Sequence, residues 1–146
     1  MNAHKTIEDV KKALDALKEL LSHDCVKNLE VSESFSIKND YAGKSFPNAA
    51  DAGVYIFTDD KGYVLYIGKA SSGLGQRIGN EYIGRGGALK GTKISEATEL
   101  HTIRMEPNFS FMAPAIEEYL IGEICPPNNK VGIGSRTRRG NPAGEA

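Results

Sequence analysis

The sequence predicts an α+β domain, in which a β-hairpin and a further strand combine with amphipathic helices. Two runs rich in β-branched and aromatic residues, 54–57 and 63–67, flank the turn-forming stretch 59–62, which is a hairpin pattern. Apolar residues recur at helical spacing in 7–22, and a second helical stretch opens at Pro114. With 146 residues the chain is most simply one compact unit. We divide it into an N-terminal helix with connecting segment (1–52), a central domain (53–131) and a basic flexible tail (132–146).

The N-terminal helix is predicted over residues 7–22. Thr6 can cap it, and Asp9 stands at the third position after the cap, as in a capping box. Its apolar side chains fall on one arc and its charged side chains on the other. This helix either packs on the domain or offers a dimer surface. Residues 24–52 alternate only weakly and predict an uncertain strand followed by a loop.

The hairpin is expected to place two phenols side by side. If residues 59–62 form the loop, Tyr55 lies opposite Tyr66 on the neighbouring strand. Lys69 follows the second strand and Arg77 ends the next loop, so two cations come close to this face. Tyrosines, a lysine and an arginine grouped in this way indicate a site for an anion.

Downstream of the hairpin the pattern predicts a short helix over 74–82, a flexible basic loop, a strand over 97–105 and a helix over 114–125. On the last helix Glu117 falls inside the apolar stripe, whereas Glu118 falls outside it. A carboxylate on a core-facing stripe is costly unless it is paired or binds a metal. Glu117 is therefore the functional candidate, and a structural ion pair with Arg77 or Arg104 is the alternative.

Composition narrows the class of protein. The net charge is −1, yet residues 61–104 hold seven Lys or Arg against three Glu, a balance of +4. Cys25 and Cys125 have no partner spacing, so we expect core thiols in a reducing compartment, without a disulfide framework or zinc site. No apolar stretch approaches the ~20 residues of a membrane span. We expect a cytoplasmic protein without a membrane partner.

A set of residues in the central domain resembles the GIY-YIG endonuclease family. Gly53-Val54-Tyr55 stands for the first signature triplet, with Val in place of Ile, and Tyr66-Ile67-Gly68 is the second triplet unchanged. Four further matches follow in the order that the family uses: Lys69, Arg77, Glu117 and Asn129. The resemblance implies a small three-stranded antiparallel sheet flanked by helices, to which this chain adds the N-terminal helix. The loop before Arg77 is one residue longer here, and Tyr82 is the nearest match to a further family position.

The resemblance also implies a function, namely metal-dependent hydrolysis of DNA phosphodiester bonds. A single Mg²⁺ or Mn²⁺ ion would be held by Glu117 together with water and phosphate oxygens. Arg77 would bind the scissile phosphate, and Tyr55 or Tyr66 would act as general base with help from Lys69. Asn129 and Tyr82 would support the site. The residues expected to contact DNA are Lys69, Arg77, Arg85, Lys90 and Lys93.

Two other functions are open at this point. One is a non-catalytic nucleic-acid-binding module that keeps the fold. The other is a structural partner protein that assembles through its N-terminal helix. Cleavage of DNA would distinguish an endonuclease from the non-catalytic binding module. Deletion of the N-terminal helix tests the structural partner, because that function predicts a change in oligomer size.

Overall fold

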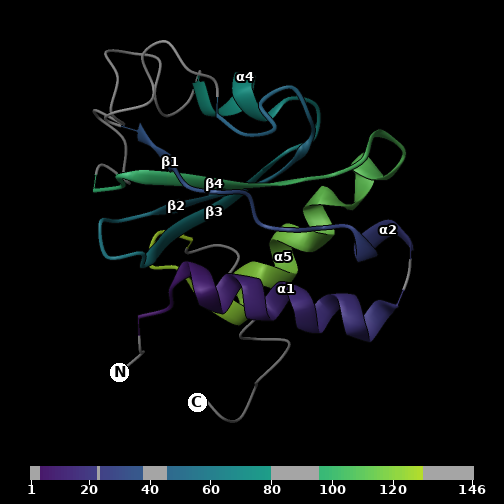
Figure 1. Ribbon diagram of the computed structural model, residues 1–146, viewed down its shortest axis with the longest axis horizontal. Helices are drawn as coiled ribbons and strands as arrows, with labels where there is room; N and C mark the ends of the chain where they lie inside the picture. Colours follow the sequence, from purple (N-terminus) through teal and green to yellow (C-terminus); the bar gives the residue numbers. More distant parts are fainter. Residues whose placement is uncertain (1–3, 23, 38–45, 80–95, 130–146) are drawn as a thin grey trace.

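A computed structural model of the chain describes residues 4–22, 24–37, 46–79 and 96–129. It has an α+β fold built on a four-stranded antiparallel sheet with the strand order β1-β4-β2-β3. Helices α1 and α5 lie on one side of the sheet and α4 on the other (Figure 1). The strands are β1 (Phe35–Ser36), β2 (Gly53–Thr58), β3 (Val64–Ala70) and β4 (Glu99–Arg104). The helices are α1 (Ile7–Leu21), α2 (Asp24–Lys27), α4 (Leu74–Ile78), the 3-10 helix η2 (Pro107–Met112) and α5 (Ala113–Ile124).

The expected three-stranded sheet has a fourth strand, which corrects the prediction. β1 pairs with β4 through Phe35 and Leu100, and Val31 forms an isolated bridge to Ile103. The segment 31–37 thus follows the outer edge of β4. An uncovered strand edge would present a row of unpaired backbone groups, and this short segment satisfies several of them. Its weak sequence alternation reflects a strand of only two residues.

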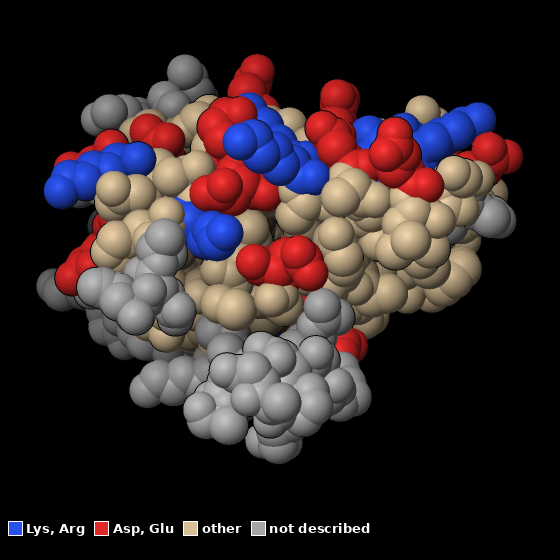
Figure 2. Space-filling view, turned by 90° about the horizontal axis from the view of Figure 1, so that it is seen from below, with Lys and Arg blue, Asp and Glu red and all other residues tan. Residues whose placement is uncertain are grey.

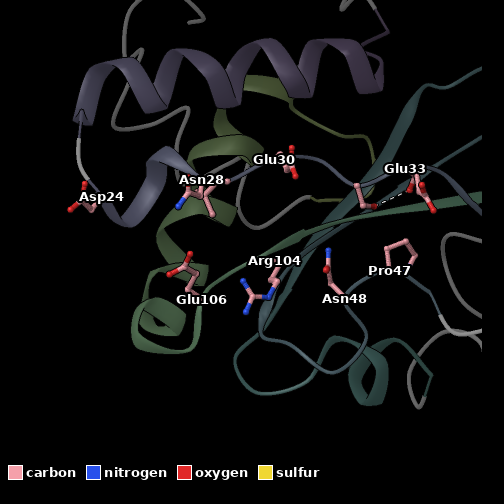
Figure 3. Close-up of a pocket in the computed structure, with 10 residues that line it drawn as sticks. Asp24, Asn28, Glu30, Glu33, Pro47, Asn48, Arg104 and Glu106 are labelled. Atoms are coloured by element: carbon pink, nitrogen blue, oxygen red, sulfur yellow. Dashed lines mark hydrogen bonds between the residues drawn. The ribbon is translucent and has the colours of Figure 1, made fainter.

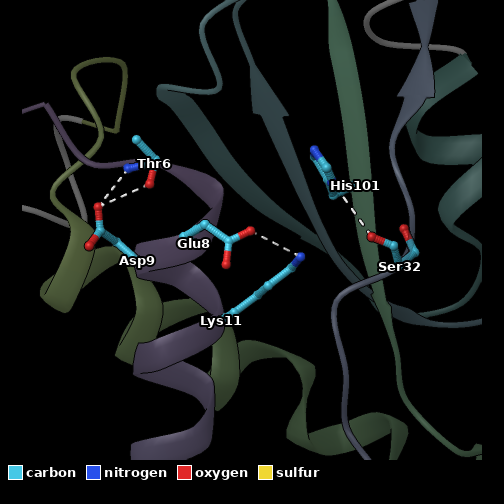
Figure 4. A network of polar contacts seen from close by, with 6 residues as sticks. All are labelled: Thr6, Glu8, Asp9, Lys11, Ser32 and His101. Atoms are coloured by element: carbon cyan, nitrogen blue, oxygen red, sulfur yellow. Dashed lines mark hydrogen bonds and ion pairs between the residues drawn. The ribbon is translucent and has the colours of Figure 1, made fainter.

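Helix α1 starts as the sequence predicts. The backbone N–H of Thr6 donates to a carboxylate oxygen of Asp9 at 2.8 Å and completes a capping box (Figure 4). The same hydrogen bond is the main cause of the lowered pKa of Asp9. The apolar face of α1 is buried with α5 in one hydrophobic cluster, so packing on the domain is confirmed. Assembly of a dimer through this helix stays a prediction.

The face of the molecule on the side of α1 and α5 carries charges of both signs. Basic and acidic side chains lie intermixed along one edge of this face (Figure 2). Lys11, for example, pairs with Glu8 at 3.3 Å. Intermixed charges create little net field, so this edge is poorly suited to attract a polyanion.

Side chains of the sheet alternate between two hydrophobic clusters. Val54, Ile56 and Ile103 pack with α1 and α5 on one face. Tyr55 and Phe57 pack with α4 on the other. The hairpin therefore buries both of its faces, which is why β2 is buried along its whole length.

The register of the hairpin differs from the predicted one. Tyr55 pairs with Gly68 and Phe57 with Tyr66, because the register shifts between Phe57 and Thr58. The turn is also tighter than expected: the Asp59 N–H donates to the Tyr63 carbonyl oxygen at 3.0 Å, which leaves three residues in the loop. Each change moves the partner of Tyr55 by one position. Tyr55 and Tyr66 still share a face, but as diagonal neighbours.

Two further findings concern expectations from composition. Cys125 follows α5 in a left-handed conformation with φ of 54° and is exposed, so the prediction of a core thiol is wrong for this residue. The last helical turn ends there, which turns the side chain away from the core. Within the described ranges, no helix has the length and apolar character needed to cross a membrane.

Candidate functional site

The two tyrosines of the hairpin lie close together on the α4 side of the sheet. Their ring centroids are 6.2 Å apart, with an interplanar angle of 33°. Tyr55 is fully buried, whereas Tyr66 is partly exposed. Of the two phenols, only that of Tyr66 therefore has surface open to a ligand in solvent.

Glycines at two positions make this arrangement possible. A Cβ atom at Gly68 would collide with the ring and hydroxyl of Tyr55, so the phenol lies directly against the Gly68 backbone. A Cβ atom at Gly53 would collide with the carbonyl oxygen of Ile103 on β4. Close packing thus requires glycine at both positions, and at Gly68 it places the Tyr55 hydroxyl against the backbone directly before Lys69.

Glu117 projects from α5 and is half-buried, while Glu118 is exposed. The helical position of the two acids is therefore as predicted. Burial raises the pKa of the Glu117 carboxyl above its usual value; the positive charges of Lys69 and Arg77 lower it, and the charge of Glu118 raises it. The structure thus brings Lys69 of β3, Arg77 of α4 and Glu117 of α5 within electrostatic range of one another.

One part of the structural alternative for Glu117 is wrong. Arg104 pairs with Asp51 instead, with 3.1 Å between Nε and Oδ2. Arg104 stands at the end of β4, opposite Gly53. The cations that influence Glu117 are on the other side of β2, at the β3 edge.

A hollow of about 420 Å³ lies where β3 leads into α4, and we call it the basic pocket. Both cations of the site, Lys69 and Arg77, line it. Its other lining residues carry no charge: Ala70, Ser71, Ser72, Gly73 and Gln76. Sequence reasoning missed Ser71, Ser72 and Gln76, although their place between the two cations was visible. Hydroxyl, amide and cationic donors without a carboxylate among them are suited to an anion.

Asn129 fastens the outer edge of β3. Its side-chain oxygen accepts from the Ile67 N–H and its side-chain nitrogen donates to the Ile67 carbonyl oxygen, both at 2.8 Å. The Asn128 N–H adds a bond of 3.2 Å to the Leu65 carbonyl oxygen. The segment after α5 is thereby joined to the strand that carries Tyr66 and Lys69. This explains how Asn129 can support the site without contacting a ligand.

The residues present fit a single divalent ion of the Mg²⁺ type. No group of three or more His, Cys, Asp or Glu side chains arranged for a metal occurs among residues 4–22, 24–37, 46–79 and 96–129. Mg²⁺ needs no such group, because it is commonly held by one or two carboxylates plus water and substrate phosphates. Burial disfavours the ionised form of Glu117, and a metal cation bound to this carboxylate would offset the cost of desolvation.

Several predicted residues cannot be placed. Tyr82, Arg85, Lys90 and Lys93 lie outside the described residues, as does the tail over 132–146. The predicted helix over 74–82 is described as far as Ile78.

A second hollow, of about 340 Å³, lies between α2, the segment 28–33 and the end of β4, and we call it the acidic pocket (Figure 3). Four acidic residues line it: Asp24, Glu30, Glu33 and Glu106. Arg104 and several uncharged residues complete the lining. Pro47 and Asn48 form part of the same wall. Its charge is unsuited to a phosphate.

Three comparisons with known proteins, using protein-family models, curated protein sequences and solved structures, give no match to this chain. The family resemblance rests on the residues quoted for it.

Proposed function

We propose that the protein is a metal-dependent DNA endonuclease of the GIY-YIG type. The observation that carries this proposal is the convergence of Lys69, Arg77 and Glu117, which come from three elements that are separate in the sequence. A carboxylate within electrostatic range of two cations, which themselves line a pocket of anion donors, is suited to phosphodiester hydrolysis, because it can hold a metal ion while the donors bind the phosphate.

Lys69 and Arg77 bind the substrate in this proposal. Arg77 offers a planar pair of N–H donors to two oxygens of the scissile phosphate. Lys69 adds a point charge on the same wall of the basic pocket. Both cations stabilise the negative charge that grows on the phosphate in the transition state.

Tyr66 is the better candidate for general base, because Tyr55 has no exposed surface. A water oxygen forms a new bond to phosphorus while the bond from phosphorus to the leaving oxygen breaks. The Tyr66 phenolate takes the proton of the attacking water, and the leaving oxygen is protonated from solvent. Tyr55 packs beside Tyr66 and fixes its place on the strand.

Glu117 would hold the metal ion, and Asn129 keeps β3 in place through its two hydrogen bonds to Ile67. A divalent ion bound there would supply charge stabilisation to the phosphate and to the leaving oxygen.

A cleavage panel tests the proposal. Plain, nicked, flapped and branched DNA are incubated with the purified protein in Mg²⁺, in Mn²⁺ and in excess chelator. We expect cleavage of at least one substrate that depends on the metal. Binding of DNA in a mobility-shift assay, with no cleavage in either metal, would instead support the non-catalytic nucleic-acid-binding module.

A further inference from the structure

We propose that Thr102 is a positioning residue for Arg77, acting through the segment 46–52 and helix α4. Its consequence for catalysis rests on the proposed function. The effect of Thr102 on the position of α4 is inferred from hydrogen bonds of the fold, and it can be measured without any substrate.

The Thr102 hydroxyl is a fully buried polar group on β4. It donates to the Pro47 carbonyl oxygen at 2.8 Å and accepts from the Asn48 side-chain nitrogen at 3.1 Å. Thr102 is also the cross-strand partner of Tyr55. One hydroxyl thus ties the start of the segment 46–52 to the centre of the sheet, and both bonds are lost if it is removed.

The conformation of Asn48 adapts the segment to this contact. Its φ of 64° is in the left-handed region, which asparagine adopts more readily than most residues. The turn at Asn48 continues with a hydrogen bond of 3.0 Å from the Asp51 N–H to the Asn48 carbonyl oxygen. Figure 3 shows the labelled side chains of Pro47 and Asn48 on the side of the segment that faces the acidic pocket.

The same segment holds the first turn of α4. The Leu74 N–H donates to the Asp51 carbonyl oxygen at 2.9 Å, and the Gly75 N–H donates to the Ala49 carbonyl oxygen at 2.7 Å. Helix α4 has Gly73 before it and no side-chain cap, so these two carbonyl groups satisfy N–H groups that the helix leaves unpaired. A Cβ atom at Gly75 would lie 3.0 Å from the Ala49 oxygen, which shows how closely the two backbones approach.

The position of Arg77 therefore depends on the segment 46–52. Helix α4 has five residues, too few to hold its own conformation without tertiary contacts. Arg77 is in its last turn and lines the basic pocket. If the segment 46–52 were less firmly held, the N-terminal turn of α4 would lose its hydrogen bonds. The Arg77 guanidinium would then no longer be held in a fixed orientation.

Amide hydrogen exchange in three variants tests this chain of contacts. Thr102→Val keeps the side-chain shape and removes both hydrogen bonds, and Thr102→Ser keeps the hydroxyl. Thr58→Val is the matched control, because Thr58 is equally buried on β2 and its hydroxyl has no hydrogen-bond partner among the described residues. Exchange is followed at the amides of Leu74 and Gly75, with the Ile67 amide, which Asn129 holds, as internal reference.

In Thr102→Val we expect exchange at Leu74 and Gly75 to be about tenfold faster, with the Ile67 amide unchanged. Thr102→Ser and Thr58→Val should match the wild type. Equal exchange in Thr102→Val and wild type, or the same acceleration in Thr58→Val, would overturn the inference. If Thr102→Val does not fold, Asn48→Gly removes the side-chain bond to Thr102 alone, while glycine accepts the positive φ, and faster exchange at Leu74 and Gly75 is again expected.

The catalytic consequence is measured separately. Cleavage by Thr102→Val should show kcat/KM lowered about tenfold, with Thr102→Ser restored to the wild-type value. Unchanged kcat/KM together with faster exchange would overturn the positioning role while leaving the anchoring intact. A wild-type protein that cleaves no DNA would instead refute the proposed function, and the exchange data would still decide the anchoring.

Discussion

The basic and acidic pockets sit at opposite edges of one small sheet and have opposite charge. The basic pocket, at the β3 edge, combines Lys69 and Arg77 with uncharged donors. The acidic pocket, where the segment 28–33 runs beside the end of β4 (called the β4 edge below), gathers four carboxylate residues, and its Arg104 pairs with Asp51. A net charge of −1 hides this separation. Electrostatic attraction of a polyanion depends on the local arrangement of charges, and the arrangement favours the β3 edge.

The segment 46–52 connects the two edges. Pro47 and Asn48 line the acidic pocket, whereas Ala49 and Asp51 accept hydrogen bonds from α4 beside the basic pocket. The β3 edge is thus expected to control binding and catalysis in addition to its own stability, whereas the β4 edge is expected to affect only stability and the position of α4. The predictions below test this division.

Removal of charge should matter at the basic pocket and not near the acidic one. We expect Arg77→Ala to weaken binding of a short DNA duplex about tenfold at 0.1 M salt and to lower the salt dependence by about one counterion. Lys27→Ala is the control, since Lys27 pairs with Asp24 of the acidic pocket at 3.0 Å. Fluorescence anisotropy titrations at several salt concentrations measure both. Equal losses of DNA affinity in Arg77→Ala and Lys27→Ala would contradict the assignment of DNA binding to the basic pocket.

The clamp on β3 should dominate stability at its own edge. Asn129→Ala removes two hydrogen bonds and leaves the Ile67 N–H and carbonyl groups without partners. We expect a loss of about 2–3 kcal/mol in the free energy of unfolding, measured by urea denaturation. Asn128→Ala, which keeps the backbone bond to Leu65, should cost less than about 1 kcal/mol. A small loss in Asn129→Ala would show that solvent replaces the clamp.

Close packing against Gly68 should link stability to the tyrosine pair. Gly68→Ala puts a methyl group into the ring of Tyr55 and should cost about 1–3 kcal/mol in unfolding free energy. Gly79→Ala has open space around the new methyl group and should be neutral or slightly stabilising. Thermal denaturation of both proteins measures the difference. Similar melting temperatures for the two variants would count against the packing described for Tyr55.

His101 should make the β4 edge sensitive to acid. Burial lowers its pKa from the usual 6.5, while the Ser32 carbonyl oxygen, 3.4 Å from Nδ1, and the charge of Glu99 raise it and that of Lys11 lowers it (Figure 4). Below pH 6.5 the unfolded chain then binds more protons at this histidine than the folded chain does. The free energy of unfolding therefore falls as pH drops through this value. We expect a change of less than about 1 kcal/mol between pH 7.5 and 5.5. In His101→Gln the free energy of unfolding, measured by urea denaturation, should depend less on pH. An unchanged pH dependence would show that another group causes it.

Much of the fold follows from local sequence patterns. The capping box of Thr6 and Asp9 and the apolar stripes of α1 and α5 are local features, and the structure keeps them. Glu117 could be separated from Glu118 because a helix fixes the direction of each side chain. The sequence therefore predicts the candidate residues on β3, α4 and α5, although it does not predict how they are arranged in space.

Features set by local backbone geometry or by contacts distant in sequence differ from the prediction or are absent from it. The shift between Phe57 and Thr58 and the tighter turn at Asp59 are backbone events that side-chain alternation does not specify. The role of Thr102 depends on carbonyl and amide groups of Pro47 and Asn48, more than fifty positions away. The fourth strand is too short to have a period of its own.

The central claim is that Glu117, beside Lys69 and Arg77, forms the catalytic site of a one-metal phosphodiesterase. Single-turnover cleavage of the best DNA substrate in Mg²⁺ tests it most directly, with Glu117→Gln compared with Glu118→Gln. We predict that the first variant loses activity by about 10³-fold or more while keeping its fold. The second variant, changed at the exposed neighbouring position, should stay within about twofold of the wild type. Full activity in Glu117→Gln would contradict the claim.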